Sequence, residues 1–287
     1  STIERPKVIY NKNTGQFAMW FHLELTQWGV GYDSAYVGVA FSDNVTGPYT
    51  FIDAYRPNTH MSRDMALFVD DDETAYHISA ADDNYDMRIR KLTPDYLGVT
   101  EEDVLILERE HREAPALFKH KGKYFLITSA ATGWDPNAGG LYVADSIYGP
   151  WERRGNPFRG ENDQTSFDSQ STFVLPVPGY EDAYLYMGDR WQRGNIQHSP
   201  YVWLPIQLEP DNLTMEWEDE WTLEEFFAES TSIRSFSFDE ASATLWKGQG
   251  LRKNSDIYSL SGKKIKSTDW LELPTLPRGI YFTNPIQ

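Results

Sequence analysis

Short apolar runs bounded by turn residues recur along the chain with a period of roughly fifty residues. Each repeat opens with an extended run, and these runs cover 4–11, 62–70, 113–121 and 169–177. A turn rich in Asn, Asp, Gly or Lys then leads to a second run, at 15–22, 73–80, 122–130 and 182–191. Third runs follow at 35–43, 87–95, 140–148 and 201–209. Weaker fourth runs close the repeats at 49–57, 101–109, 151–158 and 215–223.

This pattern predicts an all-β fold, because the runs have strand length and no long segment has helical periodicity. Four strands in a repeat of roughly 40–50 residues are typical of a β-propeller blade, and four such blades are expected here. A Gly-Pro-aromatic turn follows the third run in two repeats, at 47–49 and 149–151. A jelly roll or sandwich also has many short strands, but it would not explain why strand order and turn chemistry recur.

The repeats predict a β-propeller domain over residues 1–227. Residues 228–287 do not continue the pattern and are less acidic. They predict a β-rich appendage of short strands around turns at Ser261-Gly262 and Pro277-Arg278-Gly279.

Composition narrows the classes of partner. The net charge of −17 argues against nucleic acid or an anionic membrane as a partner, because proteins bind both mainly through Lys and Arg. A neutral substrate is compatible with this charge. Aromatic residues make up 15% of the chain, with ten Trp, enough for a core and for a site lined by flat faces. Cysteine is absent, and no apolar run is long enough to span a bilayer.

Polar residues stand where the first runs begin: Glu4, Asp64, Glu113 and Gln170. In a propeller the innermost strands run along one axis, so these residues are expected to face one another across a funnel mouth. Any one of them alone would be a solvated strand end; four in register favour a site. Glu4 and Glu113 share a Glu-x-Pro frame, in which Pro is expected to hold the preceding residue extended and fix the aim of the glutamate.

Crowded carboxylates near aromatic residues match glycoside hydrolysis. One acid with a raised pKa protonates the leaving oxygen, while an opposite group handles water or the anomeric carbon. Crowding and partial desolvation are expected to raise the pKa of one carboxyl group, which becomes the proton donor.

Loops after the second runs carry further candidates for substrate binding. Trp134 and Trp191 are candidates to stack on a sugar, although a Trp in a β protein is more often in the core. Arg190 beside Asp189 is either a contact to substrate or a structural ion pair. The remaining candidates are Tyr32, Thr132 and Asn137.

No cofactor and no metal are expected. The acidic turn at 69–73 lacks the spaced ligands of a calcium loop, so a structural calcium ion is not indicated. The six His residues have no metal-binding spacing.

Several motifs together resemble glycoside hydrolase family 43, and within it the branch of exo-β-1,3-galactanases. The likeness covers roughly residues 4–225, and its motifs are "ERPKVIYN", "SRDMALFVDDD", "EAPALFKHKGKYFLITSAATGWDPN", "SIYGPW", "FDSQST", "MGDRW" and "YVWLP". The resemblance implies a five-bladed β-propeller and hydrolysis with inversion. It also implies that Glu113 is the general acid, that Asp64 orients the sugar and tunes the acid, and that Gln170 stands where other members have a base.

The resemblance further assigns Glu4 to sugar hydroxyls of the cleaved residue, with contacts at that subsite from Tyr32, Thr132 and Trp134. A neutral amide is a poor base, so Gln170 would act through its imidic tautomer or position water. Family members carry a whole blade before the "ERPK" motif, so the first blade is expected to be missing, or replaced by the tail or another chain. The tail looks like sorting domains of secreted Bacteroidetes proteins, which predicts an extracellular or periplasmic location in a bacterium.

The sequence thus predicts an exo-acting β-1,3-galactanase that acts on neutral galactose-containing polysaccharides or oligosaccharides. Two alternatives stay open. The first is another specificity of the same family, β-xylosidase or α-L-arabinofuranosidase. The second is a non-catalytic glycan-binding propeller.

Overall fold

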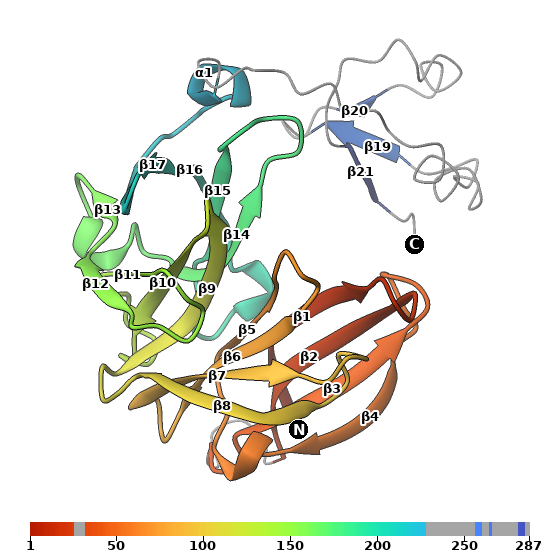
Figure 1. Cartoon of the computed structure of the whole chain (residues 1–287). Helices are drawn as coiled ribbons and strands as arrows, with labels where there is room; N and C mark the ends of the chain where they lie inside the picture. The colour runs from red at the N-terminus through yellow and green to blue at the C-terminus, as the bar shows by residue number, and fades with distance from the viewer. Residues whose placement is uncertain (26–31, 228–255, 260–263, 266–280, 285–287) are drawn as a thin grey trace. The chain divides into compact units, whose positions relative to one another are not determined.

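The computed structural model describes residues 1–25, 32–227, 256–259, 264–265 and 281–284 (Figure 1). The chain forms two compact units, Ser1–Arg234 and Ser235–Gln287. Among the described residues, no helix is long and apolar enough to cross a membrane. The all-β prediction is confirmed, because strands dominate the first unit and its only α-helix among the described residues is the short α1 (Leu223–Phe227).

Three four-stranded antiparallel sheets follow one another along the first unit, each with its strands in chain order. The first contains β1 (Thr2–Asn11), β2 (Gln16–Glu24), β3 (Tyr36–Ser42) and β4 (Thr50–Tyr55). The second contains β5 (Met65–Val69), β6 (Ala75–Ala81), β7 (Asp86–Leu92) and β8 (Val99–Leu107). The third contains β9 (Arg112–His120), β10 (Lys123–Ala130), β11 (Gly140–Ala144) and β12 (Glu152–Gly155).

The fourth repeat is built differently from its prediction. Its first three strands form a sheet of β14 (Gln170–Pro176), β15 (Tyr184–Asp189) and β16 (Tyr201–Pro205). The predicted third strand at 201–209 is split, because β17 (Gln207–Glu209) leaves this sheet for another. The predicted fourth strand at 215–223 is wrong: β18 (Asn212–Glu216) pairs with β17 and, in parallel, with β13 (Phe158–Arg159). Within residues 32–227, three short 3-10 helices lie in connections, at Pro57–Thr59, Asp163–Thr165 and Ile196–His198.

Apolar cores lie between neighbouring sheets. Trp20, Val39 and Leu67 belong to a core between the first and second sheets, and Ile78 and Leu126 to one between the second and third. A third core contains Phe125, Val174 and Tyr186 and joins the third sheet to the fourth. Because alternate residues of a strand point to opposite faces, each sheet sends one set of side chains into such a core.

The first strands of the four sheets are neighbours in space: β1 contacts β5, β5 contacts β9, and β9 contacts β14 (Figure 1). Residues at the starts of these strands are therefore brought together although they are far apart in sequence. This arrangement positions the site.

The Glu-x-Pro frames differ from their prediction. Arg5 and Ala114, which precede the two prolines, have φ values of 50° and 51°, in the left-handed region and not in the extended one. Both lie in β-bulges, because the register shifts between Glu4 and Lys7 in β1 and opposite Ile127 and Ser129 in β9. A bulge adds one residue to a strand and changes the direction of neighbouring side chains. The bulges, and not an extended residue before proline, therefore set the direction of Glu4 and Glu113.

The second unit contains a sheet of β20 (Lys264–Ile265), β19 (Asp256–Ser259) and β21 (Tyr281–Asn284), in that order and antiparallel. The turns expected at Ser261-Gly262 and Pro277-Arg278-Gly279 lie outside the described residues.

Candidate active site

Glu113 lies at the centre of a polar cluster, where the bulge of β9 places it. It is only 9% exposed. Its Oε1 accepts a hydrogen bond from Nε2 of Gln170 at 2.8 Å, and its Oε2 accepts one from Nδ2 of Asn84 at 3.0 Å. Glu113 and Gln170 come from different sheets, so the contact depends on β9 and β14 lying side by side.

Burial raises the pKa of Glu113, and the negative charge of Asp64 raises it further, to about 8. Arg5, the amide of Gln170 and Arg112 act in the opposite direction but do not outweigh burial. A carboxyl group with this pKa is mostly protonated at neutral pH, which is the state a proton donor needs.

Arg5 is the cation of the cluster, and it is buried. Its Nε lies 3.4 Å from Oδ1 of Asp64, and its Nη1 donates to both carboxylate oxygens of Asp189 at 3.1 and 3.2 Å. Its Nη2 donates to Oε1 of Gln170, and the guanidinium lies 5.3 Å from the ring centre of Trp191. Burial opposes the charge of Arg5, but Asp64 and Asp189 raise its pKa, so the guanidinium stays charged.

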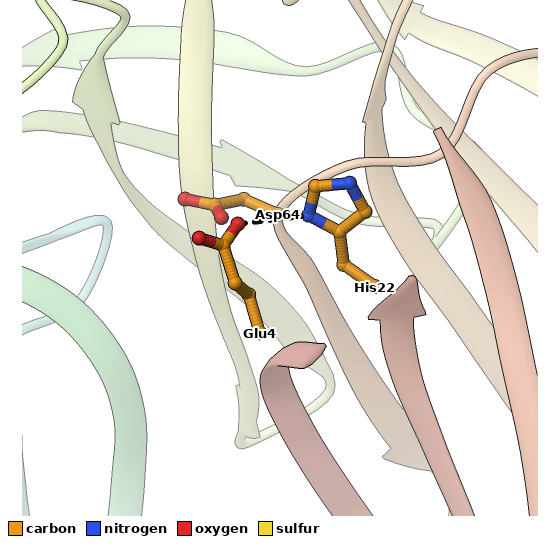
Figure 2. Close-up of side chains that lie close together, drawn as sticks. All are labelled: Glu4, His22 and Asp64. Atoms are coloured by element: carbon orange, nitrogen blue, oxygen red, sulfur yellow. Dashed lines mark ion pairs between the residues drawn. The ribbon is translucent and has the colours of Figure 1, made fainter. Parts of the chain in front are cut away.

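A second group adjoins Arg5: Glu4, His22 and Asp64 point toward one another (Figure 2). His22 Nδ1 lies 3.1 Å from Oε2 of Glu4 but makes no well-directed hydrogen bond, whereas Nε2 contacts Oε1 of Glu24 at 2.8 Å. Tyr32 donates to Oε1 of Glu4 at 2.7 Å. Burial opposes ionisation of Glu4, yet the nearby His22 imidazole and the hydrogen bond from Tyr32 hold its pKa below the ordinary value.

Glu4, His22 and Asp64 each offer a ligand atom, and these atoms lie within 4.8 Å of one another. The set has the donor chemistry of a cation site. However, the guanidinium of Arg5 already lies against Asp64 and repels a second cation. The absence of a resident metal therefore stays a prediction.

Trp191 contacts Gln170, and Trp134 in turn contacts Trp191. Trp191 donates its indole N–H to Oε1 of Gln170 at 2.9 Å, and its ring centre lies 5.9 Å from that of Trp134. Trp134 is carried by the loop after β10. Asn137 braces this loop, since its side chain bonds both backbone groups of Ala130 and the hydroxyl of Thr132 at 2.7–2.9 Å.

Arg190 lies elsewhere. Its guanidinium donates to the backbone oxygen of Phe167 at 2.8 and 3.0 Å and lies over the ring of Trp217. Asp189 has its ion pair with Arg5, so the structural pair between Asp189 and Arg190 considered from sequence does not form. Two surface hollows, of about 660 and 740 Å³, contain neither Glu113 nor Gln170, although Arg190 lines the larger.

The structure thus gathers most of the sequence candidates, and it adds residues that sequence reasoning missed. Glu4, Asp64, Glu113, Gln170 and Asp189 are linked through Arg5 or through direct contacts. The missed residues are Arg5, His22 and Asn84. A signal for Arg5 was available: three carboxylates expected at one place need a cation, and Arg5 stands inside "ERPK" beside one of them.

Residues 10–222 match the family model for glycosyl hydrolases family 43. The chain belongs to this family. No curated protein is similar enough in sequence to match it.

Solved structures of a β-1,3-galactosidase and of exo-β-1,3-galactanases are similar to this chain. The GH43 β-1,3-galactosidase BT3683 with galactodeoxynojirimycin is 38% identical, with a TM-score of 0.74 over 77% of this chain and 76% of that one. An exo-β-1,3-galactanase from Clostridium thermocellum is 34% identical, with a TM-score of 0.72 over 92% of this chain and 56% of that one. An exo-β-1,3-galactanase from Phanerochaete chrysosporium, solved with β-1,3-galactotriose, is 34% identical, with a TM-score of 0.68 over 75% and 48%. The chain therefore spans about half the length of the last two.

Proposed function

We propose that this family 43 hydrolase is an exo-acting β-1,3-galactanase that releases galactose from β-1,3-galactan or arabinogalactan backbones with inversion. Its similar structures are described as β-1,3-galactosidases and exo-β-1,3-galactanases, and one of them holds β-1,3-galactotriose. The uncharged substrate suits a chain of net charge −17.

In this proposal Glu113 is the general acid that protonates the departing glycosidic oxygen. Burial and, after it, the charge of Asp64 keep the pKa of Glu113 high, and Asp64 orients the sugar. Glu4, with Tyr32 bonded to it, accepts hydrogen bonds from hydroxyl groups of the cleaved galactose. Thr132 contacts the sugar at the same subsite, and Trp134 and Trp191 form its aromatic side.

One observation carries the proposal. Polar residues from the starts of four sheets meet around a buried glutamate whose pKa is raised to about 8. Structural ion pairs do not need a neutral carboxyl group at their centre, whereas an acid catalyst does.

We also propose that the sheets of the first unit are blades of the family's five-bladed propeller. Support comes from the recurring strand order and the contacts between first strands. Apolar side chains on the outward faces of the first and fourth sheets also support it: Val8 and Tyr10 on β1, and Phe173 and Trp203 on β14 and β16, are all exposed. A further blade would pack on such faces.

A polysaccharide substrate is too large to enter a cell intact. We therefore propose an extracellular or periplasmic location, which fractionation of cells that produce the protein would test.

Replacement of Glu113 by Gln tests the function. Activity on β-1,3-galactan should fall at least about 100-fold, because general acid catalysis typically contributes that much or more. The same change at Glu152, an exposed residue of β12, should leave release of galactose unchanged. Near-normal turnover by the Glu113→Gln protein would refute the assigned acid, and binding of galactan without any product from the unaltered protein would favour a non-catalytic glycan-binding role.

A further inference from the structure

The side-chain amide of Gln170 has every hydrogen-bonding position occupied. Its Oε1 accepts from Nη2 of Arg5 and from the indole nitrogen of Trp191. Its Nε2 donates to Oε1 of Glu113 at 2.8 Å and to Oγ of Ser129 at 2.9 Å. An amide offers two hydrogens and two lone pairs, so no capacity remains for a water molecule.

Chemistry fixes which end of the amide faces which neighbour. A guanidinium and an indole N–H can only donate, so the group that faces Arg5 and Trp191 must be the oxygen. The NH2 group consequently faces Glu113. The reverse orientation would set donors against donors on one side and is excluded.

The same neighbours oppose the imidic tautomer. That tautomer places a proton on the amide oxygen and leaves the nitrogen free to accept one. Here the oxygen lies between a guanidinium charge and a second donor, which stabilise its partial negative charge and disfavour a proton on it. Ion pairs with Asp64 and Asp189 hold the guanidinium of Arg5 against the amide oxygen of Gln170.

We propose that Gln170 is a positioning residue for the proton donor Glu113, and that it does not take the proton from the attacking water. This inference rests on the proposed galactanase function. The proton of Glu113 passes to the departing oxygen, the bond from that oxygen to the anomeric carbon breaks, and water bonds to that carbon. The proton released by the water passes to a carboxylate or to solvent. Gln170 holds the carboxyl group of Glu113 in line for the first of these transfers.

The two roles predict different dependences on the leaving group. A residue that serves the acid matters only when the leaving group needs a proton, as the sugar alcohol of galactan does. A residue that serves water matters for every substrate. The 2,4-dinitrophenolate of an aryl β-galactoside leaves without protonation, so it isolates the second case.

The test compares Gln170→Met and Gln170→Glu with the unaltered protein on β-1,3-galactan and on 2,4-dinitrophenyl β-galactoside. Met has a similar length and no donor, and Glu, when ionised, supplies a stronger base that cannot donate to Glu113. Both variants should lose galactan activity while they keep aryl galactoside activity, so the ratio of the two should change by about 100-fold. Retained aryl galactoside activity also shows that each variant is folded.

Equal losses on both substrates, in variants whose thermal unfolding is unchanged, would overturn the positioning role. Full galactan activity of Gln170→Glu would also overturn it, since a carboxylate would then have replaced a working base. If the unaltered protein hydrolysed neither substrate, the proposed galactanase function would be refuted, and the inference with it. That result is read from the unaltered protein alone, so it is distinct from a failure of the positioning role, which is read from the variants.

Discussion

Two buried ionisable residues of the site differ in charge state: Arg5 is charged and Glu113 is neutral. Arg5 keeps its charge because Asp64 and Asp189 both lie against it. Glu113 has only amide donors at its oxygens, and burial then makes the neutral form the stable one. One site thus holds a fixed cation and a transferable proton a few side chains apart.

The raised pKa of Glu113 has a cost in stability that depends on pH. Below the ordinary pKa of 4.5, Glu113 is protonated in the folded and unfolded chains alike, so it adds no cost. As pH rises toward about 8, only the unfolded chain ionises freely, and the folded protein loses stability. Glu113→Gln removes this dependence, and its stability relative to the unaltered protein should therefore rise with pH by an amount on the order of 3 kcal/mol.

Urea unfolding of both proteins at pH 5, 7 and 9 measures this difference. A poor fit of the new amide would change the difference in free energy of unfolding by the same amount at every pH. Only the change of this difference with pH therefore reports on the pKa of Glu113. Parallel pH dependences would contradict the raised pKa.

The polar residues at strand starts were visible in the sequence because four of them stand in register, each before an apolar run. Their partners were not. Asn84 lies in the turn between β6 and β7 and reaches Glu113 only because the second and third sheets adjoin. His22 lies within an apolar strand, where a buried histidine is more often structural than part of a site.

At the scale of elements, the backbone conformation of the two Glu-x-Pro frames follows the β-bulges and not the preference set by proline. Proline disfavours the helical region for its predecessor, which led to the expectation of extended geometry. At the register shift of each strand, Arg5 and Ala114 have positive φ instead. The strand pairing thus differs from the local preference that the sequence indicates.

Replacement of Ala114 by Gly tests the bulge. Glycine adopts positive φ without steric cost, so it should leave the free energy of unfolding within about 0.5 kcal/mol. Ala116 is a matched control, because it is equally buried in the same strand without a positive φ. Ala116→Gly should lose about 1 kcal/mol, as glycine does within a strand. Equal losses in chemical denaturation would contradict the role of the bulge.

The outer strands of the fourth repeat could not be predicted from period alone. An apolar run at 201–209 looks continuous, but Ile206 still donates its N–H to the backbone oxygen of Tyr184 on β15, and the residues after it form β17, which pairs with β18 instead. The following strand β18 then finds β13, more than fifty residues earlier in sequence, as a partner. Such a parallel pairing depends on the neighbouring sheet and leaves no local signal.

At the scale of the whole molecule, the site exists because four first strands converge, and the net charge plays little part in it. A neutral substrate has no long-range attraction to a chain of net charge −17. The value of kcat/KM on β-1,3-galactan should therefore change by less than about twofold between 50 and 500 mM NaCl, a range over which salt screens exposed charges. A steep dependence on salt would indicate a charged glycan as the true substrate.

Proton NMR during hydrolysis of β-1,3-galactotriose is the most direct test of the central claim, that the cluster around Glu113 cleaves terminal β-1,3-linked galactose with inversion. The first sugar signal should be α-galactose accompanied by galactobiose, and it should be absent with the Glu113→Gln protein. Initial release of the β anomer, or the same signal from both proteins, would contradict the account.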